Sequence, residues 1–524
     1  MAEAPNAGAS KEVRRNADLF AVKKKRPEQF ITDELVIALC GPIGSPIHKV
    51  AEAIQKALQK EFGYTTSAPI RLSDFIREHG NPQATDIAAI DTLPNSAKFK
   101  EKKKLIEQGN QLRAAYSNSV LADLAIHKIA ASREGGAETA TRRIYHIIDS
   151  VKNKEELEAL RSVYGEMLYF VGVFSPLAIR ERALEDAGMS SAEVHMLIDQ
   201  DSGEEIDNGQ TVRDTFPQAD FFLRIETDTD SQILGKVERF LHLILGTKVL
   251  TPTLAETAMY QASSAAGNSA CLSRQVGAAV TDRKGQIISI GWNDVPRSGG
   301  GLYAYNPADP TGEHDRRCWN ISGGTCFNDA EKDLLTHLVV EELINSGLAN
   351  PDKKDQITKM IRSNKKLSGL IEFSRSIHAE MHAILNAGLS DGGRIKEGKL
   401  FVTTYPCHAC ARHIIASGIS EIYYIEPYRK SLAVKLHRDS ITEQDSDGTS
   451  KVKILMYEGV SPTRYPGLFR VPQDSRKENG KMRPVNPMKA KPRFARTLEA
   501  VPVLESLKVK ELQDQGLISK GERQ

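Results

Sequence analysis

The first half of the chain alternates short apolar runs with longer amphipathic stretches. The apolar runs lie at 34–39, 69–72, 143–148, 167–174 and 221–225. Apolar residues at helical spacing occupy the intervals between them, at 47–62, 105–131 and 157–163. Strands that alternate with helices predict a parallel sheet with helices on both faces. We therefore expect residues 31–245 to form an α/β domain built on a doubly wound parallel sheet.

The second half repeats this pattern with a different spacing. A helical stretch at 253–272 is followed by apolar runs at 276–280, 287–293, 400–404, 421–426 and 452–457. Five strands with flanking helices predict a five-stranded α/β/α domain over residues 246–473. The polar residues 1–30 favour a flexible leader, and residues 474–524, rich in Lys, Arg and Pro, favour an extended basic tail.

Composition adds few restrictions. The 524 residues are 40% hydrophobic and 26% charged with a net charge of +2, which is ordinary for a globular protein of two to four domains. Basic runs at 23–26 and 102–104 are typical of solvated surface on so balanced a chain. The sequence has no apolar run of membrane length and no secretory signal, and its six cysteines suit a reducing compartment, so we expect a cytoplasmic protein without a membrane partner.

A glycine loop joins the first strand to the first helix. It reads Gly-Pro-Ile-Gly-Ser at 41–45, and such a strand, loop and helix can cradle phosphate with backbone N–H groups. Pro46, Ile47 and His48 stand where a working P-loop places Gly, Lys and Ser or Thr. We expect a P-loop-like, nucleotide-kinase-like domain that binds a nucleotide for regulation without transferring phosphate. The candidate nucleotide-binding residues are Gly41, Gly44, Ser45, Lys49 and Asp149; Asp149 is equally typical of an ordinary strand end.

Two short motifs in the second half carry candidate metal ligands. His378-Ala379-Glu380 is followed by Pro406-Cys407-His408-Ala409-Cys410, which together spell H-x-E and P-C-x-x-C. One imidazole and two thiolates fit tetrahedral Zn²⁺ and leave its fourth position for a water. Cys407 and Cys410 share one helical face at a helix N-terminus, where the helix dipole favours thiolates. The sequence therefore predicts a catalytic zinc held by His378, Cys407 and Cys410.

Glu380 lies two residues after the ligand His378 and points elsewhere, so it is free to move protons. We predict that Glu380 is the general acid and base of the site. A structural zinc knuckle or a redox pair would explain a lone C-x-x-C equally well. The joint motif, with an apolar strand before Pro406, favours the catalytic reading.

Two segments that precede these motifs also resemble those of a known family. The segments 269–278 (Ser-Ala-Cys-Leu-Ser-Arg-Gln-Val-Gly-Ala) and 291–296 (Gly-Trp-Asn-Asp-Val-Pro) resemble the deoxycytidylate deaminases. With its P-loop-like domain, the chain from 31 to 470 is similar to the two-domain deoxycytidylate deaminases of bacterial anti-phage systems. The resemblance implies a mixed, cytidine-deaminase-like sheet, a Zn²⁺ cofactor and an enzyme that depletes the dCTP and dCMP pools.

The resemblance also implies substrate contacts. Asn293 matches the residue that contacts the deoxyribose, and the backbone at Ala379 matches the group that holds the pyrimidine carbonyl. Arg274 lies in the matched segment. The candidate phosphate contacts are Tyr428, Arg429 and Lys430. A second metal at Cys271, Cys318 and Cys326, with His314 nearby, is an open alternative to free cysteines.

The predicted reaction is hydrolytic deamination of dCMP, dCTP or both, in which an activated water attacks C4 of cytosine and ammonia leaves. The expected partners are free deoxycytidine nucleotides, a regulatory nucleotide or nucleic-acid inhibitor, and further copies of the chain in a homo-oligomer. Two alternatives stay open. One is a deaminase that edits RNA or single-stranded DNA, and the other is a nucleotide sensor with an inert deaminase half.

Overall fold

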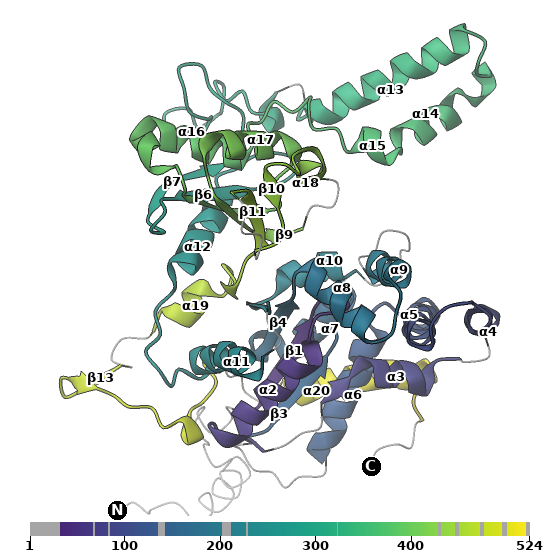
Figure 1. Cartoon of the computed structure of the whole chain (residues 1–524), viewed down its shortest axis with the longest axis vertical. Helices are drawn as coiled ribbons and strands as arrows, with labels where there is room; N and C mark the ends of the chain where they lie inside the picture. Colours follow the sequence, from purple (N-terminus) through teal and green to yellow (C-terminus); the bar gives the residue numbers. More distant parts are fainter. Residues whose placement is uncertain are drawn as a thin grey trace, which may run out of the picture.

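Two sheets, one above the other in Figure 1, organise the chain. The computed structural model describes residues 32–65, 69–81, 84–134, 142–201, 211–226, 229–321, 323–427, 431–445, 450–471, 476–494 and 500–519. The predicted leader at 1–30 lies outside these residues. None of the described helices is both long enough and apolar enough to cross a membrane.

The lower sheet is built from the predicted apolar runs. Its strands are β1 (Leu35–Cys40), β2 (Ile70–Arg71), β3 (Tyr145–Asp149), β4 (Leu168–Phe174) and β5 (Phe221–Arg224), with the short β12 (Gly459–Val460) at one edge. The order is β12-β5-β4-β1-β3-β2, and β1 to β5 are all parallel. Side chains of β1 are buried on both faces, as a doubly wound sheet requires. The predicted parallel sheet is confirmed.

Helices cover both faces of this sheet, and together they form the N-terminal domain. They are α2 (Ile47–Lys60), α3 (Leu72–His79), α4 (Thr85–Asp91), α5 (Ala97–Ala115), α6 (Val120–Glu134), α7 (Lys154–Tyr164), α8 (Leu177–Asp186), α9 (Ser191–Asp201), α10 (Val212–Thr215) and α11 (Asp230–Leu245). The predicted helix at 105–131 is two helices, because the chain turns at 116–119 between α5 and α6.

The end of the chain returns to the N-terminal domain. β12 pairs antiparallel with β5, α19 (Tyr465–Phe469) follows it, and α20 (Val501–Asp514) packs against α6. Residues 477–482 form a small hairpin of β13 (Lys477–Glu478) and β14 (Lys481–Met482). The prediction of an extended tail from 474 onward was wrong for α20. Val501 and Leu512 are buried in this helix and stand at helical spacing. The polar residues at the start of the segment obscured this pattern.

The upper sheet carries the second domain. Its strands are β6 (Gly277–Thr281), β7 (Ile287–Trp292), β8 (Lys399–Thr404), β9 (Glu421–Glu426), β10 (Ile441–Thr442) and β11 (Val452–Met456), in the order β10-β11-β9-β8-β6-β7. β6 is antiparallel to both neighbours, whereas β8, β9, β11 and β10 run parallel. The sheet is mixed, as expected, and has the two-residue β10 besides the five predicted strands. Its helices are α12 (Leu254–Ala266), α16 (Ala379–Asp391), α17 (His408–Ser417) and α18 (Ala433–Leu436).

The insertion between β7 and α16 forms a helical arm. It consists of α13 (Phe327–Asn345), α14 (Lys354–Arg362) and α15 (Lys365–Ser368), and it projects away from the upper sheet in Figure 1. The sequence predicted no structure for this insertion. Several large apolar side chains are exposed along it, among them Leu334, Leu338, Leu348 and Met360.

Candidate active site

Two helix N-termini bring the predicted metal ligands together. His378 is the N-cap residue of α16, and Cys407 is the N-cap residue of α17, where its thiol accepts a hydrogen bond from the Cys410 N–H at 3.4 Å. His378 Nδ1 lies 3.2 Å from Cys410 Sγ and 3.4 Å from Cys407 Sγ. Among the described residues, these three form the one group of metal-binding side chains whose ligand atoms all lie within 4.8 Å of one another.

This donor set fits Zn²⁺. Tetrahedral zinc with ordinary Zn–S and Zn–N bonds places its sulfur and nitrogen ligands about 3.6 Å apart. The observed separations of 3.2 and 3.4 Å are close to that value before any adjustment to a metal. Cys410 is fully buried and Cys407 nearly so, as expected for ligands of a metal held in the protein.

The electrostatics of the site favour a thiolate at Cys407. A hydrogen bond from Cys410, reinforced by His378, lowers the pKa of Cys407 to about 4. Burial raises the pKa of the neighbouring Cys410 thiol well above its usual range. Burial lowers the pKa of His378, but the contact with Cys407 and the charge of Glu380 outweigh it and raise that pKa to about 9. A cation bound among these groups would stabilise the thiolate forms and a neutral imidazole.

Glu380 is buried in the first turn of α16, beside the ligand group. Burial raises the pKa of its carboxyl group, while the positive charge of His378 acts in the opposite direction. A carboxyl group with a raised pKa holds a proton more readily than an exposed carboxyl group and can pass it on. This is the property that a proton carrier in the site needs.

Close packing between β7 and α16 fixes the position of the ligand helix. A Cβ atom added to Gly291 would lie 2.4 Å from the Ala383 nitrogen and 2.6 Å from the Ala379 oxygen. Only glycine therefore allows the helix to approach the strand this closely. Ala379 is fully buried in this contact, between His378 and Glu380.

Asn293 holds the segment that carries Arg274. Its Oδ1 accepts the Val276 N–H at 2.7 Å, and its Nδ2 donates to the Arg274 carbonyl oxygen at 2.8 Å. Asn293 is buried, whereas the Arg274 side chain is exposed and lies 4.0 Å from Glu426. Asn293 thus has a positioning role that the sequence did not indicate, and one amide hydrogen stays available for another acceptor.

The remaining predicted residues give no second ligand group within the described part of the chain. Tyr428, Arg429 and Lys430 lie outside the described residues. Cys271, Cys318 and Cys326 are free thiols, and they are not among the described groups of three potential ligands with the required spacing.

The predicted glycine loop lies in the N-terminal domain, between β1 and α2. Gly44 adopts a left-handed φ of 85°, and the buried Ser45 hydroxyl has no hydrogen-bond partner within the described part of the chain. His48 forms a hydrogen bond with Asp149, which ends β3. The structure therefore brings Gly44, Ser45 and Asp149 to one end of the sheet, with Gly41 beside them and Lys49 in the first turn of α2.

Sequence reasoning missed Asp201, whose carboxylate reaches this loop from the end of α9. It accepts the Ile43 N–H at 2.6 Å, and the Lys152 ammonium group contacts both Asp201 and the Gly41 carbonyl oxygen. A carboxylate and a lysine thus meet the loop from segments far away in the sequence, and no local motif signals either residue.

Sequence reasoning also missed Tyr405 and Glu443. The Tyr405 hydroxyl donates to Glu443 Oε1 at 2.8 Å, and the Tyr405 ring packs edge-on against Tyr424 with centroids 4.8 Å apart. Tyr405 stands two residues before Cys407, so this contact links the metal-ligand loop to the segment after α18. The aromatic residue before Pro406 was the available signal, but it does not identify its partner.

Comparisons with known proteins agree with the geometry. Residues 252–426 match the cytidine and deoxycytidylate deaminase zinc-binding region. The deoxycytidylate deaminase of Enterobacteria phage T2 is 29% identical over 209 residues, which cover 40% of this chain and 96% of that protein. The phage T4 deoxycytidylate deaminase is 28% identical over 179 residues, which cover 34% of this chain and 80% of that protein. A solved dCMP deaminase from cyanophage S-TIM5, in complex with dCMP and dUMP, has 20% identity and a TM-score of 0.23, covering 40% of this chain and 99% of that one.

Proposed function

The second half of the chain is a zinc-binding deaminase domain and makes the protein a hydrolase, and from this premise we propose that it converts deoxycytidine nucleotides, dCMP, dCTP or both, into deoxyuridine nucleotides and ammonia. The observation that carries the proposal is the ligand group His378, Cys407 and Cys410 with the buried Glu380 beside it. Three protein ligands leave one coordination position for a water, which is the arrangement of catalytic zinc sites.

Zinc held by His378, Cys407 and Cys410 would lower the pKa of a bound water and so would supply a nucleophile at neutral pH. Glu380 accepts one proton from the attacking water as the water oxygen bonds to C4 of the cytosine ring. Glu380 then passes that proton to N3 of the ring. The second proton of the water moves by way of Glu380 to the exocyclic amino group, the C4–N bond breaks, and ammonia leaves with a C4 carbonyl in its place.

The substrate is positioned by residues around this centre. The backbone at Ala379 holds the pyrimidine carbonyl, and the remaining amide hydrogen of Asn293 meets the deoxyribose. Arg274, exposed on the segment that Asn293 holds, contributes positive charge for the nucleotide phosphates. Tyr428, Arg429 and Lys430 belong to the same proposed phosphate-binding region.

The N-terminal domain regulates this reaction by binding a nucleotide without transferring its phosphate. Two observations support this assignment. The Ser45 hydroxyl is buried in the glycine loop and has no partner in the described segments, and His48, paired with Asp149, stands where phosphoryl transfer needs a Mg²⁺-binding hydroxyl. Regulated depletion of deoxycytidine nucleotides is the role that the similarity to anti-phage deaminases suggests for the whole chain.

The experiment that tests the proposed activity is ammonia release. The zinc-loaded protein is incubated separately with dCMP, dCTP, and an oligonucleotide that contains cytosine in single-stranded form. We expect ammonia from at least one free nucleotide and none from the oligonucleotide. Deamination of the oligonucleotide alone would identify an editing enzyme, and the absence of ammonia from all three would identify an inert deaminase domain.

A further inference from the structure

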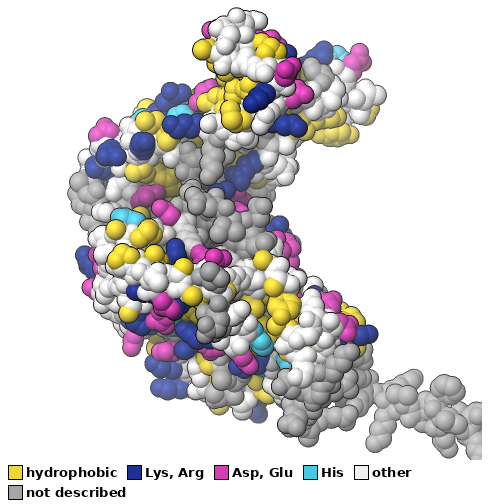
Figure 2. Space-filling model, turned by 90° about the vertical axis from the view of Figure 1, so that its right-hand side faces the viewer, with side chains coloured by type: hydrophobic (Ala, Val, Ile, Leu, Met, Phe, Trp, Pro, Cys, Tyr) yellow, Lys and Arg dark blue, Asp and Glu magenta, His cyan; other side chains and the backbone are white. Residues whose placement is uncertain are grey.

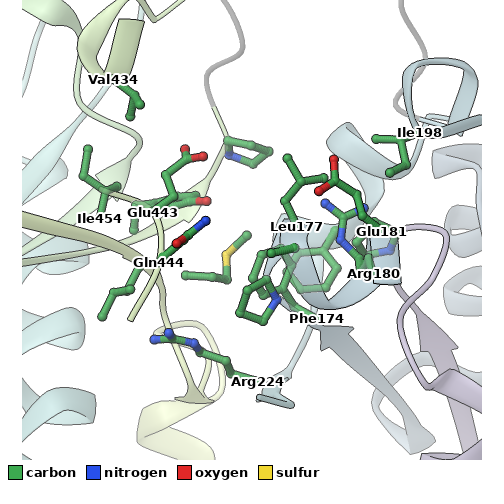
Figure 3. Close-up of a pocket in the computed structure, with 18 of the residues that line it drawn as sticks. Phe174, Leu177, Arg180, Glu181, Ile198, Arg224, Val434, Glu443, Gln444 and Ile454 are labelled. Atoms are coloured by element: carbon green, nitrogen blue, oxygen red, sulfur yellow. The ribbon is translucent and has the colours of Figure 1, made fainter. Parts of the chain in front are cut away.

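A cavity of about 510 Å³ lies between the two domains, away from the metal ligands. Seen from the right-hand side of Figure 1, the molecular surface is hollowed between the domains (Figure 2). The close-up in Figure 3 shows Phe174, Leu177 and Arg180 on one side of the cavity and Glu443, Gln444 and Ile454 on the other. The volume is that of a typical site for a small molecule.

The cavity lies at the carboxyl ends of the parallel strands of the N-terminal domain. Pro42 follows β1, Phe174 ends β4 and Arg224 ends β5, and all three line it. Open parallel sheets bind ligands outside this edge. Here the deaminase domain closes that edge with residues of β9, β10 and β11, so the site has walls from both domains.

Arg180 supplies a buried positive charge with unused hydrogen-bond donors. Its Nε donates to the Ser175 carbonyl oxygen at 3.0 Å and one Nη donates to the Ile43 carbonyl oxygen at 3.3 Å. Within the described part of the chain, no carboxylate lies within 4 Å of this guanidinium group. A guanidinium group has five N–H donors, so three stay available, and a buried cation with unused donors favours an anionic ligand.

The carboxylates that line the cavity are engaged elsewhere. Asp201 pairs with Lys152 at 2.8 Å, Glu443 accepts the Tyr405 hydroxyl, and Glu181 lies 3.6 Å from His195. Their negative charges also act on Arg180, but each of these carboxylates contacts another group, so the unused N–H donors of Arg180 remain available to a ligand. Glu443 and Gln444, on the opposite wall, can accept and donate hydrogen bonds to the edge of a polar ring.

Apolar side chains from both domains form the rest of the walls. Phe174, Leu177 and Ile198 face the cavity from the N-terminal domain, and Ile454 and Met456 face it from the deaminase domain. Walls of this kind suit a flat ring with a polar edge. We propose that the cavity binds a nucleotide, with its phosphate at Arg180 and its base between the apolar walls, next to Glu443 and Gln444.

A nucleotide in this cavity would contact residues that lead to the metal ligands. Glu443 binds Tyr405, Tyr424 lines the cavity and packs against Tyr405, and Tyr405 precedes Cys407 by two residues. Arg224 adds a second connection between the domains, because its guanidinium group, at the end of β5, lies 3.5 Å from the Asp445 carboxylate. Binding therefore fixes both the spacing of the two domains and the position of the metal-ligand loop, and coupling of this kind is reciprocal at equilibrium.

This inference rests on the proposed regulation by the N-terminal domain and places the regulatory nucleotide between the two domains. The glycine loop adjoins the cavity, since a Cβ atom at Gly44 would lie 2.8 Å from the Cβ atom of Arg180. The nucleotide that the loop contacts is thus also contacted by the deaminase domain.

Calorimetric titration of the full-length, zinc-loaded protein tests the inference. The probes are ATP, GTP and dTTP, which lack cytosine, with inorganic triphosphate and thymidine as partial probes. We expect one of the three nucleotides to bind with a stoichiometry of one. Leu177 lines the cavity and is partly exposed. The larger side chain of Leu177→Trp fills the cavity and should weaken that binding by at least about tenfold. Leu234→Trp, on a helix away from the cavity, is the matched control and should leave binding unchanged.

Arg180→Gln removes the charge and should weaken nucleotide binding while leaving thymidine binding unchanged. The unfolding midpoint and zinc content of each variant exclude misfolding. Failure of all three nucleotides to bind, or equal binding by the parent and Leu177→Trp, would overturn the inference. Ammonia release from dCMP by Leu177→Trp and the parent, measured without added nucleotide, tests the proposed activity separately, because Leu177 is not one of the proposed substrate contacts.

Discussion

Arg239 and Glu256 form a two-point ion pair that joins the last helix of the N-terminal domain to the first helix of the deaminase domain. The two guanidinium nitrogens lie 2.9 and 2.7 Å from the two carboxylate oxygens. The same carboxylate accepts the N–H groups of Thr253 and of Val460 in β12. Glu256 is almost fully buried, so this one side chain connects three segments.

Replacing Glu256 by Ala should therefore destabilise the whole chain. The change leaves Arg239 and two backbone N–H groups without their acceptor, which costs about 3 kcal/mol by the usual effect of breaking a buried ion pair. Urea-induced unfolding, followed by tryptophan fluorescence, measures the shift. Glu158→Ala removes an exposed partner of Lys154 and should change the unfolding free energy by less than about 0.5 kcal/mol. Equal effects of the two substitutions would contradict the assignment.

Glu380→Ala should keep zinc and lose turnover. Glu380 is not one of the three ligand side chains, and a missing general acid and base lowers rates by about 10²- to 10⁴-fold. His378→Ala and Cys407→Ala should lose both zinc and activity. Metal content and ammonia release, measured on the same samples, separate the two outcomes. Zinc loss from Glu380→Ala would show that this carboxylate binds the metal.

Asn293→Ala should lower turnover of deoxycytidine nucleotides by about tenfold or more, because the Val276 N–H and the Arg274 carbonyl oxygen lose their partner and the deoxyribose loses its proposed contact. Zinc content should stay at the level of the parent. Asn293→Asp retains the acceptor for Val276 but not the donor to Arg274, so it should recover part of the activity. Unchanged dCMP turnover in Asn293→Ala would rule out both roles.

Asp123→Asn should stabilise the protein at neutral pH. Burial raises the pKa of Asp123 above the usual value of about 3.9, although a hydrogen bond from Ser119 lowers it in part. The folded state then binds this proton more tightly than the unfolded state, so the contribution to stability is present in acid and is lost as pH rises through the folded-state pKa. The asparagine side chain does not ionise. Its stabilising effect in urea unfolding should therefore appear at neutral pH and disappear in acid.

Ser45→Ala should weaken binding of the regulatory nucleotide while leaving basal deamination unchanged. The hydroxyl has no hydrogen-bond partner among the described residues, so its removal costs little folding energy but deletes one contact to phosphate. Substitution of Gly44 is a poorer test, since its left-handed φ and its contact with Arg180 make any side chain disruptive. Nucleotide titration and dCMP turnover are the measurements. Equal binding by Ser45→Ala and the parent would place the phosphate away from this loop.

Apart from β10 and β12, the strands of both sheets could be predicted because they are nearly continuous apolar runs with polar ends. Their order could not, because it depends on pairings between distant segments. The two-residue strands β10 and β12 are too short to leave a periodic pattern. The helical arm was missed for a related reason: α13 exposes Leu334 and Leu338 instead of burying an apolar stripe, so its hydrophobic residues do not show the usual amphipathic spacing.

In the candidate sites, the local motifs could be predicted from the sequence, whereas contacts between residues far apart in the sequence could not. His378, Glu380, Cys407 and Cys410 lie within two short segments whose spacing carries the chemistry. Asp201 reaches the glycine loop from 158 residues away, and Glu443 reaches Tyr405 from 38 residues away. Neither acid is distinguished by its neighbours in the sequence, so only the fold reveals that it contacts a functional loop.

The return of the chain through β12 and α20 has a consequence for dissecting the protein. A protease cut between α11 and α12 would give two fragments that stay associated, because the second fragment supplies an edge strand beside β5 and a helix against α6. A chain shortened to its first 245 residues would expose both surfaces and invite aggregation through the free strand edge. The contributions of the two domains therefore have to be separated by point substitutions, since a cut between α11 and α12 does not yield two independent proteins.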